Sequence, residues 1–201
     1  MKNIKTQILS SALTLFNEKG ISDTTLRTIA QETGISQGNL NYHYKTKGLL
    51  LEALYFQLVE KMDAMVLELG KNVVDFRLIK STSEKTMEQM YEYRFLLLSF
   101  TKVMMENPAI RTHFSLLQQK RNEEFIQIFK LLAKNEFIRE EEFEGEFRRL
   151  YERMNVFGDY WINDFVVFGS TKSIAYYTGL FLETLYPYLT PKGKIEYLRV
   201  I

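Results

Sequence analysis

The sequence predicts an all-α fold, with a small N-terminal helix-turn-helix domain in front of a larger helical body. Residues 25–47 hold two short helix-forming segments separated by Gly34, which is the sequence form of a helix-turn-helix. Apolar residues recur at helical spacing along the rest of the chain. Three prolines and ten glycines among 201 residues leave little room for long irregular segments.

The first predicted helix covers about residues 3–19 and ends at Gly20. The segment superficially resembles a signal peptide, because lysines precede a short apolar run. The run ends in polar residues 17–19 rather than in the small residues of a cleavage site. We therefore interpret it as a mature amphipathic helix whose apolar stripe recurs every four residues, at Ile4, Ile8, Ala12 and Phe16.

Short polar residues mark the boundaries of the next three helices. Thr24 or Thr25 can cap the second helix, and Gly34 permits the turn that ends it. Ser36 caps the third helix, in which Leu40 is the main inward residue. A fourth helix, capped by Thr46, opens a much longer apolar pattern.

The third helix carries side chains suited to reading DNA. Gln37, Asn39 and Asn41 have amides that can pair with a base edge, and Gly38 permits close backbone approach. A phenol, an imidazole and two ammonium groups follow and can bind phosphates, at Tyr42, His43, Lys45 and Lys47. Taken singly, each residue also fits ordinary surface, and Tyr44 fits the core better. Taken in this order after a helix-turn, they indicate a DNA-reading head.

Composition restricts the other function classes. Residues 1–47 hold six basic and three acidic side chains, a net charge of +3, and the remainder carries −2 because the whole chain carries +1. A basic end on a mildly acidic body suits phosphate binding. The chain has no cysteine, which excludes disulfides and thiolate metal sites and suits a reducing cytoplasm. No apolar run approaches the ~20 residues that span a bilayer, so we expect no membrane partner.

The body is predicted to be helical throughout. Residues 81–84, Ser-Thr-Ser-Glu, have the form of a capping box that opens a helix reaching Glu106. Asn107-Pro108 stops that helix and starts another, which runs through Leu132. An acidic, broken segment at 136–146 precedes an aromatic-rich segment that extends to Phe168. Two further helices are expected, from about residue 172 to 186 and after Thr190.

Residues 3–50 resemble the N-terminal domain of the TetR/AcrR family of bacterial transcriptional regulators. The matching residues are Ile8, Ala12, Leu15, Phe16 and Gly20, then residues 24–30, 34–40 and 42–47, and Leu50. The resemblance covers about a quarter of the chain. It implies a DNA-binding domain at 1–47, called the head below, and a ligand-binding and dimerisation domain at 48–201, called the body.

By position, the resemblance implies base contacts from Gln37, Gly38 and Asn41. It implies contacts with the DNA backbone from Thr25, Ser36, Asn39, Tyr42, His43 and Lys47, with Lys45 nearby. Two residues depart from the family pattern. Asn41 stands where the family usually has an aromatic ring, and Gly48 replaces a residue that is often acidic. Gly48 also costs roughly 1 kcal/mol of helix propensity.

The resemblance further implies a homodimeric repressor that binds a palindromic operator and is released by a small molecule, through tilting of the fourth helix. Seven aromatic residues between Tyr151 and Phe181 could form the dimer interface with Ala175 and Gly179, or could pack only inside the monomer: Phe157, Tyr160, Trp161, Phe165, Phe168, Tyr176 and Tyr177. We expect a lipophilic or aromatic effector. The candidate lining residues, which also fit an ordinary core, are Met62, Met65, Tyr91, Phe95, Met104, Met105, Phe125, Phe129 and Trp161.

Two other function classes fit the sequence less well. A degenerate helix-turn-helix could dock another protein, and Asn41 and Gly48 are the residues that favour this alternative. A helical enzyme would need a paired acid–base or metal constellation, which the sequence lacks. His113 is isolated, so we assign it a structural role. We therefore expect no enzyme activity, no cofactor and no metal.

Overall fold

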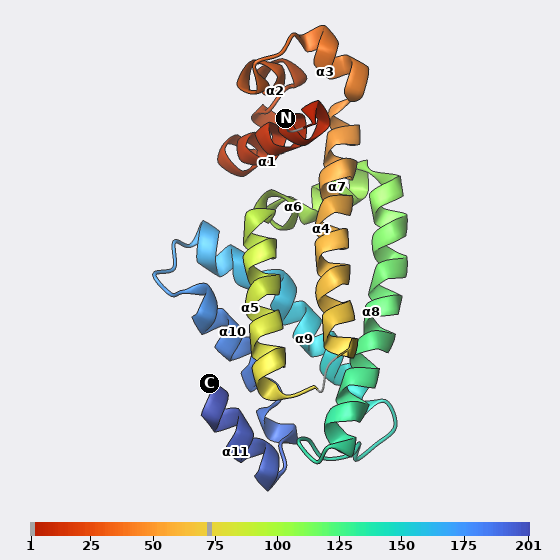
Figure 1. Ribbon diagram of the computed structural model, residues 1–201, viewed down its shortest axis with the longest axis vertical. Helices are drawn as coiled ribbons and strands as arrows, with labels where there is room; N and C mark the ends of the chain where they lie inside the picture. Colours follow the sequence, from red (N-terminus) through yellow and green to blue (C-terminus); the bar gives the residue numbers. More distant parts are fainter. Residues whose placement is uncertain (1–2, 72–73) are drawn as a thin grey trace. The chain divides into compact units, whose positions relative to one another are not determined.

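The computed structural model describes residues 3–71 and 74–201, apart from the side chain of Lys71; Lys2, counted above in the charge of the head, lies outside them. The described chain is all-α, as predicted, and its one pair of bridged extended residues is Ile138 with Leu189. None of its helices is long and apolar enough to cross a membrane. Figure 1 labels the α-helices, which are α1 Ile4–Asp23, α2 Leu26–Thr33, α3 Gln37–His43, α4 Lys47–Lys71, α5 Phe76–Glu92, α6 Arg94–Leu98, α7 Phe100–Glu106, α8 Pro108–Lys134, α9 Glu146–Ile162, α10 Ile174–Glu183 and α11 Pro191–Val200.

The chain divides into two compact units. The first unit comprises Met1–Lys61 and Glu92–His113, and the second comprises Met62–Tyr91 and Phe114–Ile201. The first unit therefore contains the head, most of α4, and the α6–α7 segment. The functional boundary expected after residue 47 remains a prediction, because the compact unit extends beyond it.

The core of the first unit begins with the apolar stripe of α1. Ile8, Ala12 and Phe16 are at most 1% exposed, which confirms the amphipathic interpretation of this helix. They share the core with Ile29 of α2 and Leu40 of α3, both fully buried. The regular part of α1 is interrupted at Gly20, where φ is +79°, and helical structure continues to Asp23.

The junction between α5 and α6 is held by a side chain of α1. Asn17 donates from Nδ2 to the carbonyl of Glu92 at 2.7 Å and accepts from the amide of Phe95 at 3.1 Å. The ring of Phe16 packs on that of Phe95, with centroids 5.2 Å apart. Because the amide of Asn17 supplies partners to the backbone groups freed at Tyr93, the break costs no unpaired polar group here.

Two predictions for this region were wrong. No helix begins at residues 81–84, because α5 already starts at Phe76, where Asp75 caps it by accepting from the amide of Leu78 at 2.8 Å. An acidic cap further upstream was available and leaves the serine-threonine segment inside the helix. The helix also does not reach Glu106, since α5, α6 and α7 are separated at Tyr93 and Ser99. The stop at Asn107 and restart at Pro108 are confirmed.

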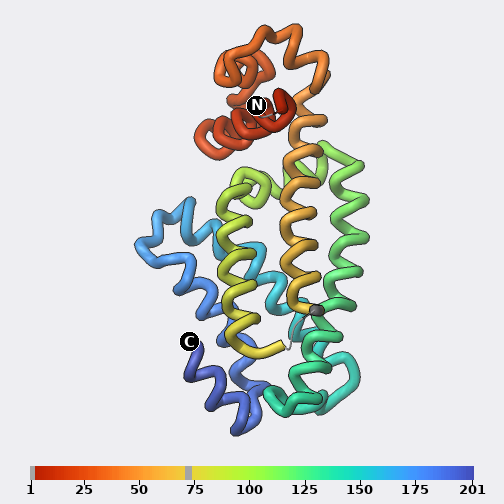
Figure 2. The backbone as a smooth tube through the Cα atoms, viewed as in Figure 1, coloured from red at the N-terminus to blue at the C-terminus, as the bar shows by residue number. Residues whose placement is uncertain are grey.

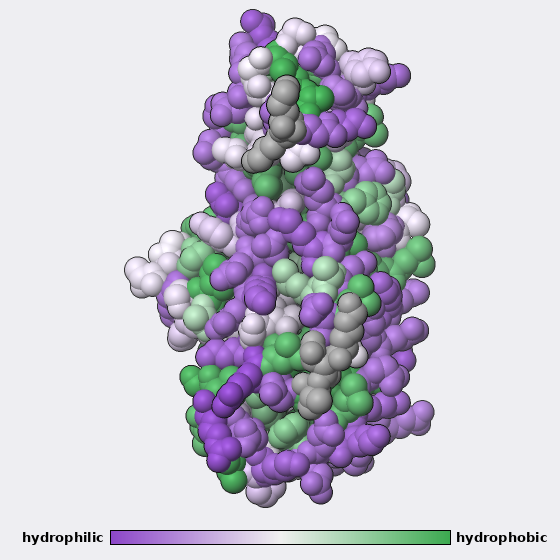
Figure 3. Space-filling view, viewed as in Figure 1, coloured by the Kyte–Doolittle hydropathy of each residue, from purple (hydrophilic) through white to green (hydrophobic). Residues whose placement is uncertain are grey.

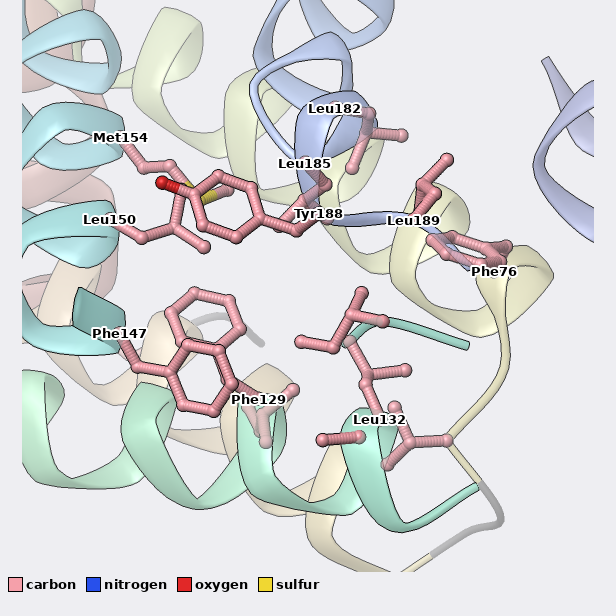
Figure 4. Packing of buried hydrophobic residues seen from close by; sticks show 14 of the residues in the cluster. Phe76, Phe129, Leu132, Phe147, Leu150, Met154, Leu182, Leu185, Tyr188 and Leu189 are labelled. Carbon is pink, nitrogen blue, oxygen red and sulfur yellow. The ribbon is translucent and has the colours of Figure 1, made fainter. Parts of the chain in front are cut away.

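The second unit is built around a large apolar core. Figure 4 shows Phe129 and Leu132 of α8 facing Phe147 and Leu150 of α9, with Leu182, Leu185 and Leu189 arriving from the C-terminal segment. The segment between α8 and α9 is fixed by Arg139, whose guanidinium binds Glu146 at 2.7 and 2.8 Å. Helix α11 begins after Thr190, as predicted, and Thr190 caps it by accepting from the amide of Gly193. The π-helix Asn163–Val167 follows α9 directly.

Candidate nucleic-acid interface

The turn between α2 and α3 has the geometry of a helix-turn-helix. Thr25 and Thr28 form a reciprocal capping box, since each side-chain oxygen accepts from the other residue's amide. At the other end of α2, Gly34 adopts the left-handed conformation at φ +73°, and its amide donates to the carbonyls of Ala30 and Gln31. Figure 2 follows the backbone through this reversal. Thr25 is thus the cap, and Thr24 is buried.

Helix α3 presents its polar side chains outward. Ser36 accepts from the amide of Asn39 at 3.1 Å and so caps the helix, as predicted. Leu40 is fully buried and anchors α3 to the core. Every other residue of its first turn and a half is exposed: Gln37, Gly38, Asn39 and Asn41. An exposed row of amides on a helix anchored by a single leucine is a surface that can enter a major groove.

The C-terminal end of α3 is aromatic. Tyr42 is 83% exposed, and its ring meets that of His43 edge-on, with centroids 5.1 Å apart. Tyr44 is half-buried, and burial raises the pKa of its phenol. Lys45 is exposed, and Thr46 caps α4 by accepting from the amide of Leu49 at 3.3 Å. Tyr42 and Lys45 therefore offer donors to solvent, whereas His43 and Tyr44 are half-buried.

The structure separates the roles of two glycines. A Cβ at Gly38 would lie 3.9 Å from the hydroxyl of Ser36, and one at Gly48 would lie 3.5 Å from Oδ1 of Asn107, both ordinary contacts. Neither glycine is therefore required by packing inside the chain. At Gly38, on the exposed face of α3, the missing side chain favours close approach by a partner. Gly48 carries only its cost in helix propensity.

Lys47 lies differently from the other expected phosphate ligands. Its ammonium donates to the carbonyls of Ile21 and Thr24, at 2.6 and 3.1 Å. No sequence pattern predicts these hydrogen bonds, because the partners of Lys47 are backbone atoms more than twenty residues away.

Two family descriptions match this chain. "Bacterial regulatory proteins, tetR family" matches residues 8–54, and "Bacterial transcriptional repressor", of the TetR type, matches residues 57–197. The second match alone covers more than half of the chain.

The chain belongs to the TetR family.

Individual relatives match over shorter stretches. The probable HTH-type transcriptional regulator YttP of Bacillus subtilis (strain 168) is 30% identical over 96 residues, which cover 48% of this chain and 42% of that protein. The tetracycline repressor protein class D of Escherichia coli is 41% identical over 54 residues, or 27% of this chain and 25% of that protein. This TetR-family chain thus aligns with less than half the length of these curated relatives.

A solved structure matches the whole chain. A TetR-family transcriptional regulator from Marinobacter aquaeolei VT8 superimposes with a TM-score of 0.90 and 22% identity, over 100% of this chain and 97% of that one. At this identity the likeness establishes the fold, an N-terminal helix-turn-helix followed by a helical C-terminal domain.

The predicted effector residues of this TetR-family member are divided between the two units. Phe95, Met104 and Met105 belong to the first unit, where Met105 is 71% exposed. The other six lie in the second unit, where Phe125 and Phe129 join the large core and Met62 and Met65 lie on α4. Tyr91 and Trp161 both contact Phe165, at centroid distances of 5.4 and 5.9 Å.

A second aromatic cluster surrounds Trp161. Its ring is 5.5 Å from that of Tyr177, whose hydroxyl donates to Asp164 at 2.6 Å. Trp161 is 2% exposed, yet its indole N–H has no hydrogen-bond acceptor among the described residues. Phe165 and Tyr177 were not predicted to line an effector site, because both were assigned to the dimer interface or to packing inside the monomer. An unpaired buried donor beside a π-helix is typical of a functional position.

His113 packs against two aromatic residues of α4. The Nδ1 atom of His113 lies 2.9 Å from the hydroxyl of Tyr55, and its ring packs edge-on against Phe56. This supports the structural role assigned from the sequence. Across residues 3–71 and 74–201, no three histidine, aspartate or glutamate side chains gather as a metal site would require.

Proposed function

We propose that this chain is a DNA-binding transcriptional regulator, which acts as a homodimeric repressor on a palindromic operator and is released by a small apolar or aromatic effector. The observation that carries the proposal is the outward polar face of α3, with Gln37 and Asn41 exposed while Leu40 is fully buried. Membership of the TetR family supports it. The proposed location is the cytoplasm, where the operator would be.

The test of DNA binding is selection of bound duplexes from a random pool, followed by two variants on the selected site. Gln37→Ala should change base preference at one position by roughly 1–3 kcal/mol. Lys45→Ala should weaken binding to all sequences alike and reduce the salt dependence by about one phosphate contact. Identical behaviour of the two variants across altered operators would contradict the division into base readers and phosphate ligands.

The rival proposal is a dimeric protein-interaction module with a degenerate helix-turn-helix. A salt titration separates the two, because phosphate contacts impose a steep fall in affinity with salt. No binding to any selected duplex or genomic fragment at low salt would favour the rival. The exposed amides of α3 and the unpacked position of Gly38 favour DNA.

Dimerisation is supported by apolar side chains left exposed on α9 and α10. Val156 is 71%, Tyr160 60% and Tyr176 43% exposed, and Ala175 and Gly179 lie beside Tyr176 on the same helix. Figure 3 shows one face of the protein, on which green hydrophobic areas are interrupted by purple hydrophilic ones. Sedimentation of wild type and Tyr160→Glu tests the proposal: the wild type should be dimeric and the variant should dissociate. Two successive major grooves, about 34–36 Å apart, require such a dimer.

Effector binding can be followed at Trp161, the single tryptophan of the chain. Aromatic compounds that bind beside it should change its emission and lower operator affinity together. An operator bound equally well with and without a compound that changes this emission would contradict release by that effector. We expect the unpaired indole N–H to favour compounds with a hydrogen-bond acceptor.

A further inference from the structure

The side chain of Lys47 crosses from the start of α4 to the turn between α1 and α2. Its ammonium donates to the carbonyl of Ile21 at 2.6 Å and to that of Thr24 at 3.1 Å. Lys47 is itself the first residue of α4. One side chain thus joins the two turns that precede α2 and α4.

The carbonyl of Ile21, in the last turn of α1, and that of Thr24, the residue after the helix, need a donor from elsewhere in the chain. Gly20 leaves the helical conformation at φ +79°, so the last carbonyls of α1 lack regular intrahelical partners. Ile21 is 6% exposed and Thr24 is fully buried, which limits access of water to this turn. A lysine ammonium at the carboxyl end of a helix also interacts favourably with the helix dipole.

The same geometry restricts what the ammonium can do toward DNA. A lysine ammonium has three donors, and two of them are used here. A phosphate beyond the reach of the third donor could be met only by abandoning both carbonyls in a largely buried turn, where an unpaired acceptor is costly. Lys45 has no such restriction, because its side chain is exposed.

The two turns joined by Lys47 carry residues that are expected to contact the DNA backbone on either side of α3. Thr25, the cap of α2, directly follows Thr24, and Lys45 and Thr46 directly precede Lys47. We propose that Lys47 is a positioning residue, which fixes the separation of the α2 and α4 N-termini so that both meet the phosphates flanking the groove that α3 enters. This inference rests on the proposed DNA-binding function.

The test compares Lys47→Ala with Lys45→Ala on the selected duplex, at a temperature where circular dichroism shows both variants fully folded. A lysine that contacts a phosphate contributes about 0.9 to the slope of log affinity against log salt. We expect Lys45→Ala to lose about that slope and Lys47→Ala to lose less than half of it. Lys47→Ala should still bind every duplex about tenfold more weakly, because the hydrogen bonds that position the two turns are lost.

A slope loss in Lys47→Ala equal to that in Lys45→Ala would overturn the inference, and so would unchanged affinity. A second measurement needs no DNA. Amide hydrogen exchange at residues 25–28 should accelerate in Lys47→Ala and stay at the wild-type rate in Lys45→Ala, and equal rates in all three proteins would also overturn it. If the wild type binds no duplex, the proposed function fails, and the exchange experiment still decides whether Lys47 holds the turn.

Discussion

The helix N-termini of the helix-turn-helix are capped by local hydrogen bonds, with the longer-range contact from Lys47 beside them, whereas the C-terminal part of the second unit is held by hydrogen bonds between distant residues. At the starts of α2, α3 and α4, the capping bonds join residues three apart: Thr28 to Thr25, Asn39 to Ser36, and Leu49 to Thr46. In the second unit, Thr190 donates to the carbonyl of Glu136, 54 residues away, and Lys80 to that of Val200, 120 residues away.

This difference has a consequence for tolerance to change. A local cap satisfies one or two backbone groups, so its loss is confined to one helix end. Where two segments distant in the sequence pack closely, the contact depends on their fit along its whole length. One added atom there displaces both segments. The head should therefore lose stability in small steps, and the C-terminal part in large ones.

Gly193→Ala should give the largest effect. A Cβ at this position would lie 1.8 Å from the carbonyl oxygen and 2.8 Å from the carbonyl carbon of Phe137. These are backbone atoms, so α11 must move away from the segment it packs against. We expect a loss of about 3 kcal/mol in the free energy of unfolding, the upper end of the usual cost of overpacking.

The matched control for that variant is Gly158→Ala in α9, where no atom lies within 4 Å of the added Cβ. Alanine there should leave stability unchanged or raise it by up to about 1 kcal/mol. Urea denaturation followed by circular dichroism measures both. Equal losses in the two variants would mean that the close approach of α11 to Phe137 does not limit stability.

Glu146→Gln should give an intermediate effect that depends on pH. Hydrogen bonds from Arg139, then from the amide of Glu142, lower the pKa of this buried carboxyl from 4.5 to about 2. Because the folded state binds this proton less tightly than the unfolded state, the stabilisation is complete above about pH 4.5 and is lost as pH falls toward 2. The variant should be about 2 kcal/mol less stable at pH 7.

The pH profile of unfolding separates this carboxylate from general acid denaturation. Wild type should lose stability between pH 4.5 and 2 more steeply than Glu146→Gln. Glu144→Gln, an exposed change just before α9, should keep the wild-type profile. Parallel profiles for wild type and Glu146→Gln would show that the pair with Arg139 does not couple this proton to folding.

The range of the contacts also explains which features the sequence predicted. Ser36 and Thr46 were identified as caps because the group that each one caps lies three residues along the chain. The hydrogen bonds from Lys47 and from Asn17 to the backbone could not be predicted, because their partners are brought close only by folding. The helix start predicted at residues 81–84 was wrong for a local reason, since Asp75 caps α5 further upstream.

In the body, residue type predicted burial only in part, since Met105 is 71% exposed, and it did not predict neighbours. Methionine and aromatic side chains at helical spacing are expected inside, and Phe95, Phe129 and Trp161 are all at most 2% exposed. The same pattern does not say which of them meet. Phe95 packs on Phe16 in the first unit, whereas Trp161 packs on Phe165 and Tyr177 in the second. A proposed effector site therefore has to be tested residue by residue.

Thr25→Ala should give the smallest effect. The substitution removes the oxygen that accepts from the amide of Thr28 at 3.1 Å, at the exposed start of α2. We expect a loss of about 1 kcal/mol in the free energy of unfolding, and Thr25→Ser, which keeps the oxygen, should restore most of it. Urea denaturation measures both variants beside Gly193→Ala. If Thr25→Ala costs as much as Gly193→Ala, the head is not stabilised in small local steps, and its stability depends on this turn as a whole, including the tie from Lys47.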